Sequence, residues 1–256
     1  MSMGRPVCTA PYIPAKATLQ IHFRAAIGNA NCCAGRLRSA RCYDTNRLML
    51  ALAHLPAPIP PDLECIRRSL ARTHIAHRDE GTHAAVALVL AGDAADLSVC
   101  LIRRADHESD RWSGHVALPG GRVDPLDLSP RGAAIRETRE EVGLRLGRAS
   151  YLGSLGAQPI GRGGKPGDMS LSSYVFYVGA VLGRFTPNEE VAEAFWVPLR
   201  HLLDPRNAGY RSAVRDGEAY ESPAVLYEGR HIWGLTYRVL TTFFERMQLQ
   251  IARPGR

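Results

Sequence analysis

Runs of apolar residues divide the body of the chain into predicted strands. Residues 83–90 (HAAVALVL) are almost continuously apolar, which is typical of a strand buried on both faces. Further strands are predicted at residues 115–118 and 171–179, and residues 151–160 are predicted to form a strand followed by a loop. Residues 97–104 form another apolar run, and Gly92-Asp93 between it and the first strand predicts a turn. The two strands at residues 83–104 are therefore expected to form a hairpin.

Apolar residues recur at helical spacing in two other places. Residues 63–76 have them on one face and arginines on the other, which predicts a helix that packs at the edge of the domain. Residues 231–244 show the same spacing and predict that the last helix opens at His231. Residues 206–229, between these regions, are predicted to be rich in loops. The chain is therefore expected to mix strands and helices.

The basic charge of the chain is concentrated near its start. The sequence holds 32 Lys and Arg against 25 Asp and Glu, a formal net charge of +7. Residues 1–61 contain seven basic residues and one acid, a net of +6, so residues 62–256 carry about +1. A nearly neutral body gives no electrostatic basis for binding DNA or RNA. We therefore expect no nucleic acid as a partner. No run approaches the ~20 apolar residues of a membrane-spanning helix, so we expect no membrane as a partner either.

Residues 1–61 are predicted to be a disordered basic leader that ends in a proline-rich linker, with the folded domain at residues 62–250. Three interpretations of residues 1–48 are open: a disordered tail, a targeting segment, or translation begun upstream of a true start at Met49. The six cysteines show no C-x-x-C pair and no metal-ligand spacing. In a chain of this size, reduced thiols and a cytoplasmic location are expected.

One stretch, residues 120–144 (GGRVDPLDLSPRGAAIRETREEVGL), combines a glycine turn, an acidic loop and a short helix. Ser129 is a suitable N-cap, Pro130 suits the first helical position, and Gly143 is a suitable stop. The predicted helix therefore covers about residues 130–142.

Three glutamates of this helix, Glu137, Glu140 and Glu141, fall on one arc at about 100° per residue. Like charges at this spacing destabilise a helix by roughly 0.2–0.5 kcal/mol per pair, and the C-terminal end of a helix disfavours anions. One interpretation is a solvated face on which Arg136 and Arg139 offset the charge. The other is a site for a hard cation such as Mg²⁺ or Mn²⁺, which would convert the repulsion into coordination.

The stretch resembles the Nudix box, whose pattern is G-x5-E-x7-R-E-U-x-E-E-x-G-U, with U an aliphatic residue. The positions that agree are Gly121, Arg136, Glu137, Glu140, Glu141, Gly143 and Leu144. Asp127 stands where the first glutamate is expected, eight residues rather than seven separate it from Arg136, and Thr138 replaces an aliphatic residue. This longer spacing is similar to that of the coenzyme A pyrophosphatase branch. A structural role is expected for Asp127.

A second resemblance lies just before the box. Coenzyme A-type Nudix proteins carry a signature that reads roughly L-L-x-x-R-S…H-x-G-Q-V-x-F-P-G-G. The positions that agree are Leu101, Ile102, Arg103 or Arg104, Gly114, Val116, Pro119, Gly120 and Gly121. Trp112, His115 and Leu118 replace the usual histidine, glutamine and phenylalanine, and the serine is missing. Half of the signature is therefore present.

A third resemblance, at residues 186–199, is to the family's E-V-x-E-x-x-W-V-P-L segment. It implies a loop, a strand and a short helix from Arg200. Glu189, Glu190 or Glu193 would add a metal ligand there or would face solvent.

The resemblance spans residues 83–247 and implies the Nudix fold, an α/β/α sandwich with a mixed β-sheet. The implied reaction is hydrolysis of a diphosphate in a nucleoside diphosphate derivative, with Mg²⁺ or Mn²⁺ as cofactor. The implied metal ligands are Glu137, Glu140, Glu141 and the backbone carbonyl of Gly121. The implied catalytic residues are Glu137, Glu140 and Arg136, which orients the glutamates by ion pairing. Arg103 and Arg104 are the candidates for binding substrate phosphate.

The implied partner is a small-molecule nucleotide. Coenzyme A or acyl-coenzyme A, cut to 3′,5′-ADP and a phosphopantetheine, is the expected substrate. The alternatives are another nucleotide (an oxidised dNTP, NADH or ADP-ribose) and a Nudix domain that binds a nucleotide without hydrolysis. Retention of all three box glutamates argues against the last of these. By analogy with the family, the chain would form a homodimer.

Overall fold

The computed structural model describes residues 58–71, 82–107, 112–160, 169–215 and 218–255. The predicted leader lies outside the described residues except for residues 58–61, so the boundary between leader and domain stays a prediction. In the described part of the chain, no helix is long and apolar enough to cross a membrane.

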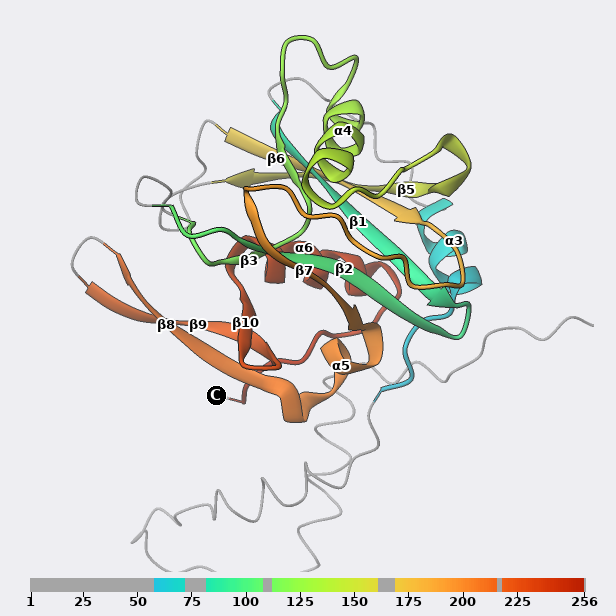
Figure 1. Cartoon of the computed structure of the whole chain (residues 1–256). Helices are drawn as coiled ribbons and strands as arrows, with labels where there is room; N and C mark the ends of the chain where they lie inside the picture. Colours follow the sequence, from blue (N-terminus) through green and yellow to red (C-terminus); the bar gives the residue numbers. More distant parts are fainter. Residues whose placement is uncertain (1–57, 72–81, 108–111, 161–168, 216–217, 256) are drawn as a thin grey trace, which may run out of the picture. The chain divides into compact units, whose positions relative to one another are not determined.

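Within the described residues, the main sheet has seven strands in the order β3–β2–β1–β6–β5, with β4 beside β1 and β7 beside β2 (Figure 1). The strands are β1 Thr82–Asp93, β2 Asp96–Arg104, β3 Val116–Ala117, β4 Gly120–Arg122, β5 Tyr151–Ile160, β6 Met169–Tyr177 and β7 Val191–Pro198. β1 and β6 are parallel and the other pairs are antiparallel, so the sheet is mixed.

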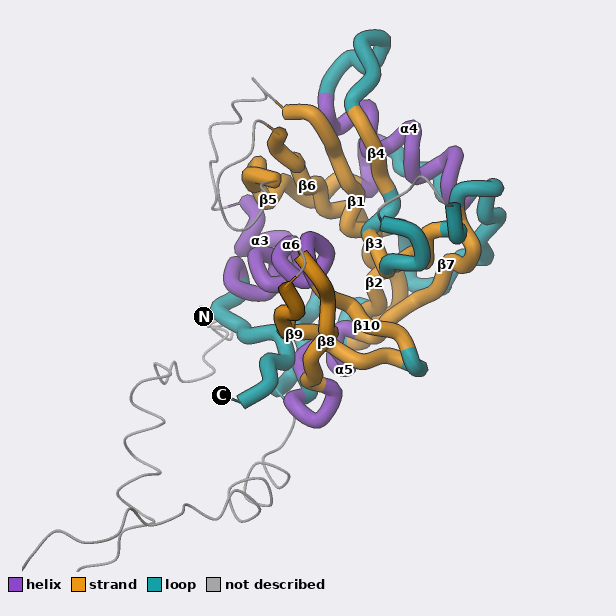
Figure 2. Tube along the Cα trace, turned by 90° about the vertical axis from the view of Figure 1, so that its left-hand side faces the viewer, coloured by secondary structure: helices purple, strands orange, loops and turns teal. Residues whose placement is uncertain are grey.

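Helices cover both faces of this sheet (Figures 1 and 2). They are α3 Leu63–Ala71, α4 Pro130–Val142, α5 Leu199–Leu203 and α6 Gly234–Arg246, with short 3-10 turns at Arg148–Ser150 and Pro205–Asn207. Alternate residues of β1 point to opposite faces of the sheet. Leu88 packs into the cluster that contains Phe243 of α6, whereas Ala87 packs into the cluster that contains Ala133 of α4. This confirms the predicted α/β/α sandwich and explains why β1 is apolar throughout.

β3 and β4 fill a gap in the sheet. β1 and β2 pair only near their turn, from Leu90 opposite Val99 to Asp93 opposite Asp96. Beyond that point the two strands diverge, and residues 115–122 lie between them: β3 pairs with β2 and β4 pairs with β1. The insertion carries the glycine turn directly beneath α4.

A second, three-stranded sheet of β8 Ala208–Arg215, β9 Glu218–Tyr227 and β10 Arg230–Trp233 was not foreseen. The prediction that residues 206–229 are rich in loops is wrong, because β8 and β9 form a long hairpin there. The last helix begins at Gly234 rather than His231, since residues 230–233 pair with β9.

The predicted β1–β2 hairpin is confirmed, but its turn lies two residues later than predicted. Gly92 and Asp93 still pair with β2, and Ala94 and Ala95 make the turn.

Candidate active site

The helix that carries the glutamates begins and ends as predicted. The Ser129 hydroxyl accepts a hydrogen bond from the Gly132 N–H at 3.1 Å, and Pro130 is the first residue of α4. Gly143 adopts φ 76°, the left-handed conformation that favours glycine, and its N–H donates to the Arg139 carbonyl. These caps fix where α4 lies along the sheet.

Two glycines of β4 let the strand lie close to both β1 and α4. Gly120 has φ 145°, and a Cβ there would lie 2.3 Å from the Ala85 carbonyl oxygen. A Cβ at Gly121 would lie 2.6 Å from the carboxyl carbon of Glu137. The space that a side chain would occupy at Gly121 is therefore taken by the Glu137 carboxylate.

The three glutamates of α4 differ in burial, although they share one arc of the helix. Glu141 is only 2% exposed, and its Oε2 accepts a hydrogen bond from the Gly120 N–H at 2.7 Å. Burial raises the pKa of Glu141 to about 8, against the effect of that hydrogen bond. Burial also raises the pKa of Glu137, while Arg136 opposes the shift. The Glu140 side chain, by contrast, is 53% exposed.

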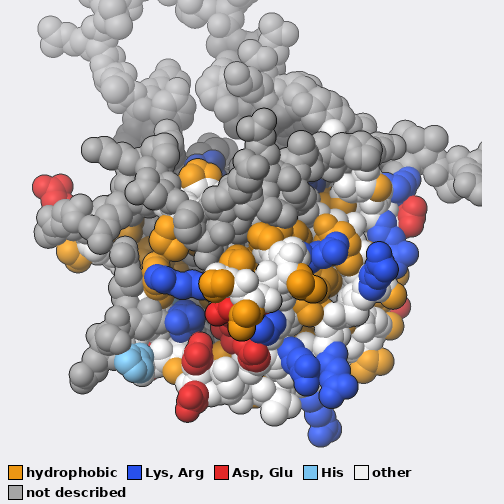
Figure 3. Space-filling model, turned by 90° about the horizontal axis from the view of Figure 1, so that it is seen from above, with side chains coloured by type: hydrophobic (Ala, Val, Ile, Leu, Met, Phe, Trp, Pro, Cys, Tyr) orange, Lys and Arg blue, Asp and Glu red, His pale blue; other side chains and the backbone are white. Residues whose placement is uncertain are grey.

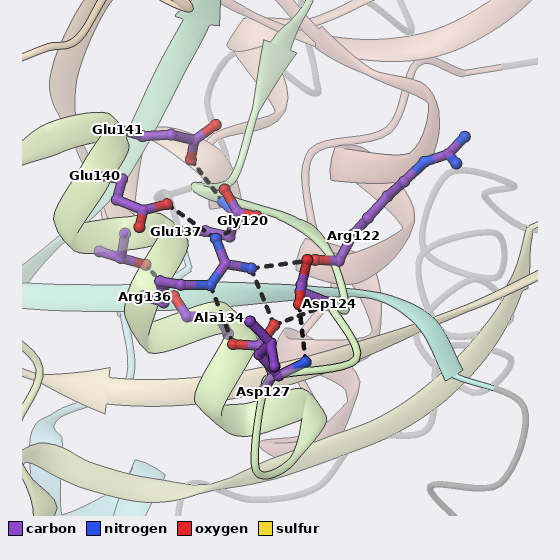
Figure 4. A network of polar contacts seen from close by, with 11 residues as sticks. Gly120, Arg122, Asp124, Asp127, Ala134, Arg136, Glu137, Glu140 and Glu141 are labelled. Atoms are coloured by element: carbon purple, nitrogen blue, oxygen red, sulfur yellow. Dashed lines mark hydrogen bonds and ion pairs between the residues drawn. The ribbon is translucent and has the colours of Figure 1, made fainter.

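Arg136 links the helix to the loop before it (Figure 4). Its Nε and Nη2 donate to the two oxygens of Asp127, each at 3.0 Å. Its Nη1 lies 3.0 Å from Glu137 Oε1 and 2.9 Å from Glu140 Oε2. Nη2 also donates to the Arg122 carbonyl at 3.4 Å. The predicted ion pairing of Arg136 with the glutamates is present, and the Arg136 hydrogen bonds lower the pKa of Asp127.

The two candidate phosphate-binding arginines lie on opposite faces of the sheet. Even-numbered residues of β2 pack toward α4 and odd-numbered residues toward α6, so Arg104 lies on the α4 face and Arg103 on the other. The charge of Arg104 acts on Glu141, partly offsetting the burial that raises its pKa. Arg103 Nη1 lies 3.6 Å from Asp106 Oδ2. The structure thus brings only Arg104 near the glutamates.

The loop before β7 lies against the end of α4. Glu193, which lies within β7, is paired with Arg230 at 2.5 Å, on the face away from α4. Glu190 is exposed, and its negative charge adds to the burial that raises the pKa of Glu141. Of the glutamates at residues 189–193, Glu190 is therefore the one whose charge acts on Glu141.

The donor set fits a hard cation in its chemistry. Glu137, Glu140 and Glu141 supply three carboxylates from one arc of α4, and Arg136, which pairs with the first two, is the guanidinium beside them. Acidic side chains gather near the middle of the face seen in Figure 3, with basic side chains to both sides. A cation beside them would lower the pKa values that burial has raised.

In this structure the glutamates are directed to protein partners. Glu137 and Glu140 pair with Arg136, and Glu141 accepts from Gly120. Among the residues that the structure describes, no three His, Cys, Asp or Glu side chains are grouped so as to hold a metal ion. The metal ligands named from the sequence stay a prediction.

Sequence reasoning missed one role at the site, the Gly120 N–H. It treated the glycine turn as a source of carbonyl ligands, whereas the turn also donates the hydrogen bond that holds Glu141. The signal was present in the adjacent glycines, which allow the backbone to approach a side chain closely.

Comparison with known proteins gives consistent matches. Residues 81–216 match the family model described as the NUDIX domain. The chain is 33% identical over 201 residues to the mitochondrial coenzyme A diphosphatase NUDT8 of Homo sapiens, covering 76% of this chain and 79% of that protein. It is 30% identical over 152 residues to an uncharacterized Nudix hydrolase, NudL, of Yersinia pestis (strain Pestoides F), covering 59% and 73%. A solved MutT/nudix family protein from Enterococcus faecalis matches with a TM-score of 0.45 and 17% identity, covering 93% of this chain and 76% of that one.

Proposed function

The chain belongs to the Nudix family and is a pyrophosphohydrolase, and we propose that it cuts the diphosphate of coenzyme A or acyl-coenzyme A, releasing 3′,5′-ADP and a phosphopantetheine. The observation that carries this proposal is the 33% identity over 201 residues with a coenzyme A diphosphatase, 79% of whose length is covered. The half-matched signature at residues 101–121 supports the same substrate.

Nudix hydrolases generally use divalent metals, and for this chain we propose Mg²⁺ or Mn²⁺. Glu137, Glu140 and Glu141, with the Gly121 carbonyl, would hold the ion. Bound there, it would offset the negative charge of the diphosphate and make a water molecule more acidic. Burial raises the pKa values of Glu137 and Glu141 although Arg136 and Arg104 act in the opposite direction, so a bound metal ion would favour the charged forms of both carboxylates.

The chain's own residues position the reacting groups. Arg136 holds Glu137 and Glu140 through Nη1, and its remaining nitrogens are fixed by Asp127, so the guanidinium cannot turn away. Glu137 and Glu140 are the groups proposed to take up a proton from the attacking water. Arg104 is the better candidate for contact with substrate phosphate, because it lies on the same face as the glutamates.

A cytoplasmic location and a homodimer, both expected from the sequence, remain predictions.

Product analysis by mass spectrometry tests the substrate assignment. The purified protein with Mg²⁺ or Mn²⁺ would meet coenzyme A, acyl-coenzyme A, NADH, ADP-ribose and oxidised dGTP, with the Glu137→Gln protein as the inactive control. We expect kcat/KM for the coenzyme A compounds to exceed the others at least about tenfold, a difference of ~1.4 kcal/mol in transition-state binding. Preferential turnover of another nucleotide, or of none, would overturn the proposal.

A further inference from the structure

Part of the β8–β9 hairpin is a bare two-stranded ribbon. β10 pairs with β9 only from Ala224 to Tyr227. From Tyr210 opposite Pro223 to residue 215 opposite Glu218, each strand has the other as its sole partner among the described strands. Isolated two-stranded hairpins are marginally stable in water, so this ribbon gains from a third strand.

The ribbon also exposes apolar side chains. Tyr210 and Val214 project from one face of β8 and are 42% and 73% exposed. Ser212 lies between them on the same face and is also exposed. Figure 1 shows the end of the hairpin extending beyond the main sheet, with β8 on the outside. The Tyr210 hydroxyl donates to the Gly255 carbonyl at 3.2 Å. No described strand pairs with the outer edge of β8, and the Tyr210 ring and Val214 are the large apolar groups on this face.

The two edges of the ribbon differ in how well they are protected. β9 carries Glu218 and Glu221, and Pro223, which lacks an N–H, in the stretch that extends beyond β10. Charged residues and proline are the usual means by which edge strands avoid pairing. β8 (AGYRSAVR) has no proline, and its charged residues are Arg211 and Arg215. Both strands carry two charged residues in this stretch, but only β9 has a proline, so the edge of β8 is better suited to pairing.

We infer that β8 pairs antiparallel with β8 of a second copy of this chain, about a two-fold axis at Ser212. The two ribbons then join into one four-stranded antiparallel sheet. In this register Ser212 faces Ser212 of the other copy, Tyr210 faces Val214, and Arg211 faces Ala213. An isologous contact of this kind closes on itself and produces a dimer rather than a filament.

The side chains of β8 suit this self-pairing. The contact between Tyr210 of one copy and Val214 of the other is an aromatic–β-branched pair, which is among the favourable cross-strand combinations. It forms twice, once on each side of the axis. No arginine faces an arginine directly, because Arg211 meets an alanine. A shift by one residue would turn Tyr210 and Val214 to the opposite face from their partners, which disfavours registers displaced by one residue.

A cysteine at the axis tests the register in the full-length protein. Directly opposed residues of antiparallel strands have Cα atoms about 4.5–5.5 Å apart, within the range that a disulfide spans. Ser212→Cys should therefore give a disulfide-linked dimer under mild oxidation, identified by mass spectrometry as two copies of the peptide at residues 212–215. Ala219→Cys, also exposed but on β9, is the control, since the two copies would lie about three strand spacings apart.

The oligomeric state tests the interface without the new thiol. Light scattering after size exclusion should give the mass of two chains for the parent protein. Val214→Glu should weaken the dimer at least tenfold, whereas Val181→Glu, another exposed valine, should leave it unchanged. A monomeric parent protein, or a dimer in which Ser212→Cys does not cross-link and Val214→Glu has no effect, would overturn the inference. Neither result bears on hydrolase activity.

Discussion

Replacing Glu141 by glutamine should remove a pH-dependent loss of stability from the metal-free protein. Burial raises the pKa of Glu141 from 4.5 to about 8. In this interval the folded protein binds a proton that the unfolded chain releases, so the free energy of unfolding falls as the pH rises from about 4.5 to about 8. Glutamine has nearly the same shape, is neutral throughout, and still offers an oxygen to the Gly120 N–H.

The size of the effect follows from the shift. From 4.5 to about 8 is about 3.5 pKa units, and one unit corresponds to ~1.4 kcal/mol, which gives an upper limit of roughly 5 kcal/mol. Repulsion by Glu137 contributes to the same shift and is altered by the substitution as well. We therefore expect the pH-dependent loss to be smaller by about 2–5 kcal/mol in Glu141→Gln than in the parent protein.

Urea unfolding in the presence of EDTA, followed by tryptophan fluorescence at several pH values between about 5 and 8, measures this difference. Asp127 does not affect this measurement. Because its pKa is lowered, the stability that its carboxylate contributes is lost only at pH values below the measured range. Glu140→Gln, at a half-exposed position, is the matched control. Mg²⁺ at about 100 times its Kd should then stabilise the parent protein by ~2.7 kcal/mol and Glu141→Gln by much less.

Parallel stability curves for the parent protein and Glu141→Gln across this pH range would refute the claim that burial controls the Glu141 carboxylate. Equal stabilisation of both by Mg²⁺, together with unchanged turnover at saturating Mg²⁺, would refute its assignment as a metal ligand.

Three further predictions concern turnover. Gly121→Ala should lower kcat by about 100-fold, the scale of a catalytic group displaced by about an ångström, because the added methyl group overlaps the Glu137 carboxylate; Gly147→Ala, where a Cβ meets nothing within 4 Å, should leave steady-state kinetics unchanged. Arg104→Ala should lower kcat/KM by about 10–100-fold, a loss of ~1.4–2.7 kcal/mol, and Arg103→Ala by less than about threefold; equal effects would contradict the assignment of the two arginines to opposite faces. Removal of divalent ions with EDTA should abolish turnover and Mn²⁺ or Mg²⁺ should restore it, and activity that persists in EDTA would argue against a metal-dependent reaction.

The sequence predicted the fold where hydrophobic pattern and burial coincide. β1 is apolar on both faces because helices cover both, so its sequence alone indicated a buried strand. The β8–β9 hairpin was missed for the converse reason: its outer half is exposed on one face and at most half-buried on the other, so no apolar period marks it. The turn between β1 and β2 was predicted two residues too early for a different reason. Gly92 has a positive φ of 113°, yet it still pairs with β2 and does not form the turn.

The prediction of the site was limited by contacts between distant segments. Helical spacing placed Glu137, Glu140 and Glu141 on one arc, but it could not indicate that β4 lies against that arc and buries Glu141. Strand alternation separates Arg103 from Arg104, yet the face on which each lies depends on where α4 packs. Local sequence therefore identified the residues, while the insertion of β4 between β1 and β2 determined their environments.

The departure of Asp127 from the usual box has a physical explanation in the same network. A metal ligand at this position would require a fixed loop length, because its oxygen would have to reach the glutamates. Asp127 instead accepts two hydrogen bonds from Arg136, and its own Oδ2 also accepts from the Asp124 N–H at 2.8 Å. A shorter aspartate and one extra residue before Arg136 are compatible with that contact, since the loop needs to reach only the guanidinium. The altered spacing therefore agrees with a positioning role for Asp127, which holds the arginine that in turn holds Glu137 and Glu140.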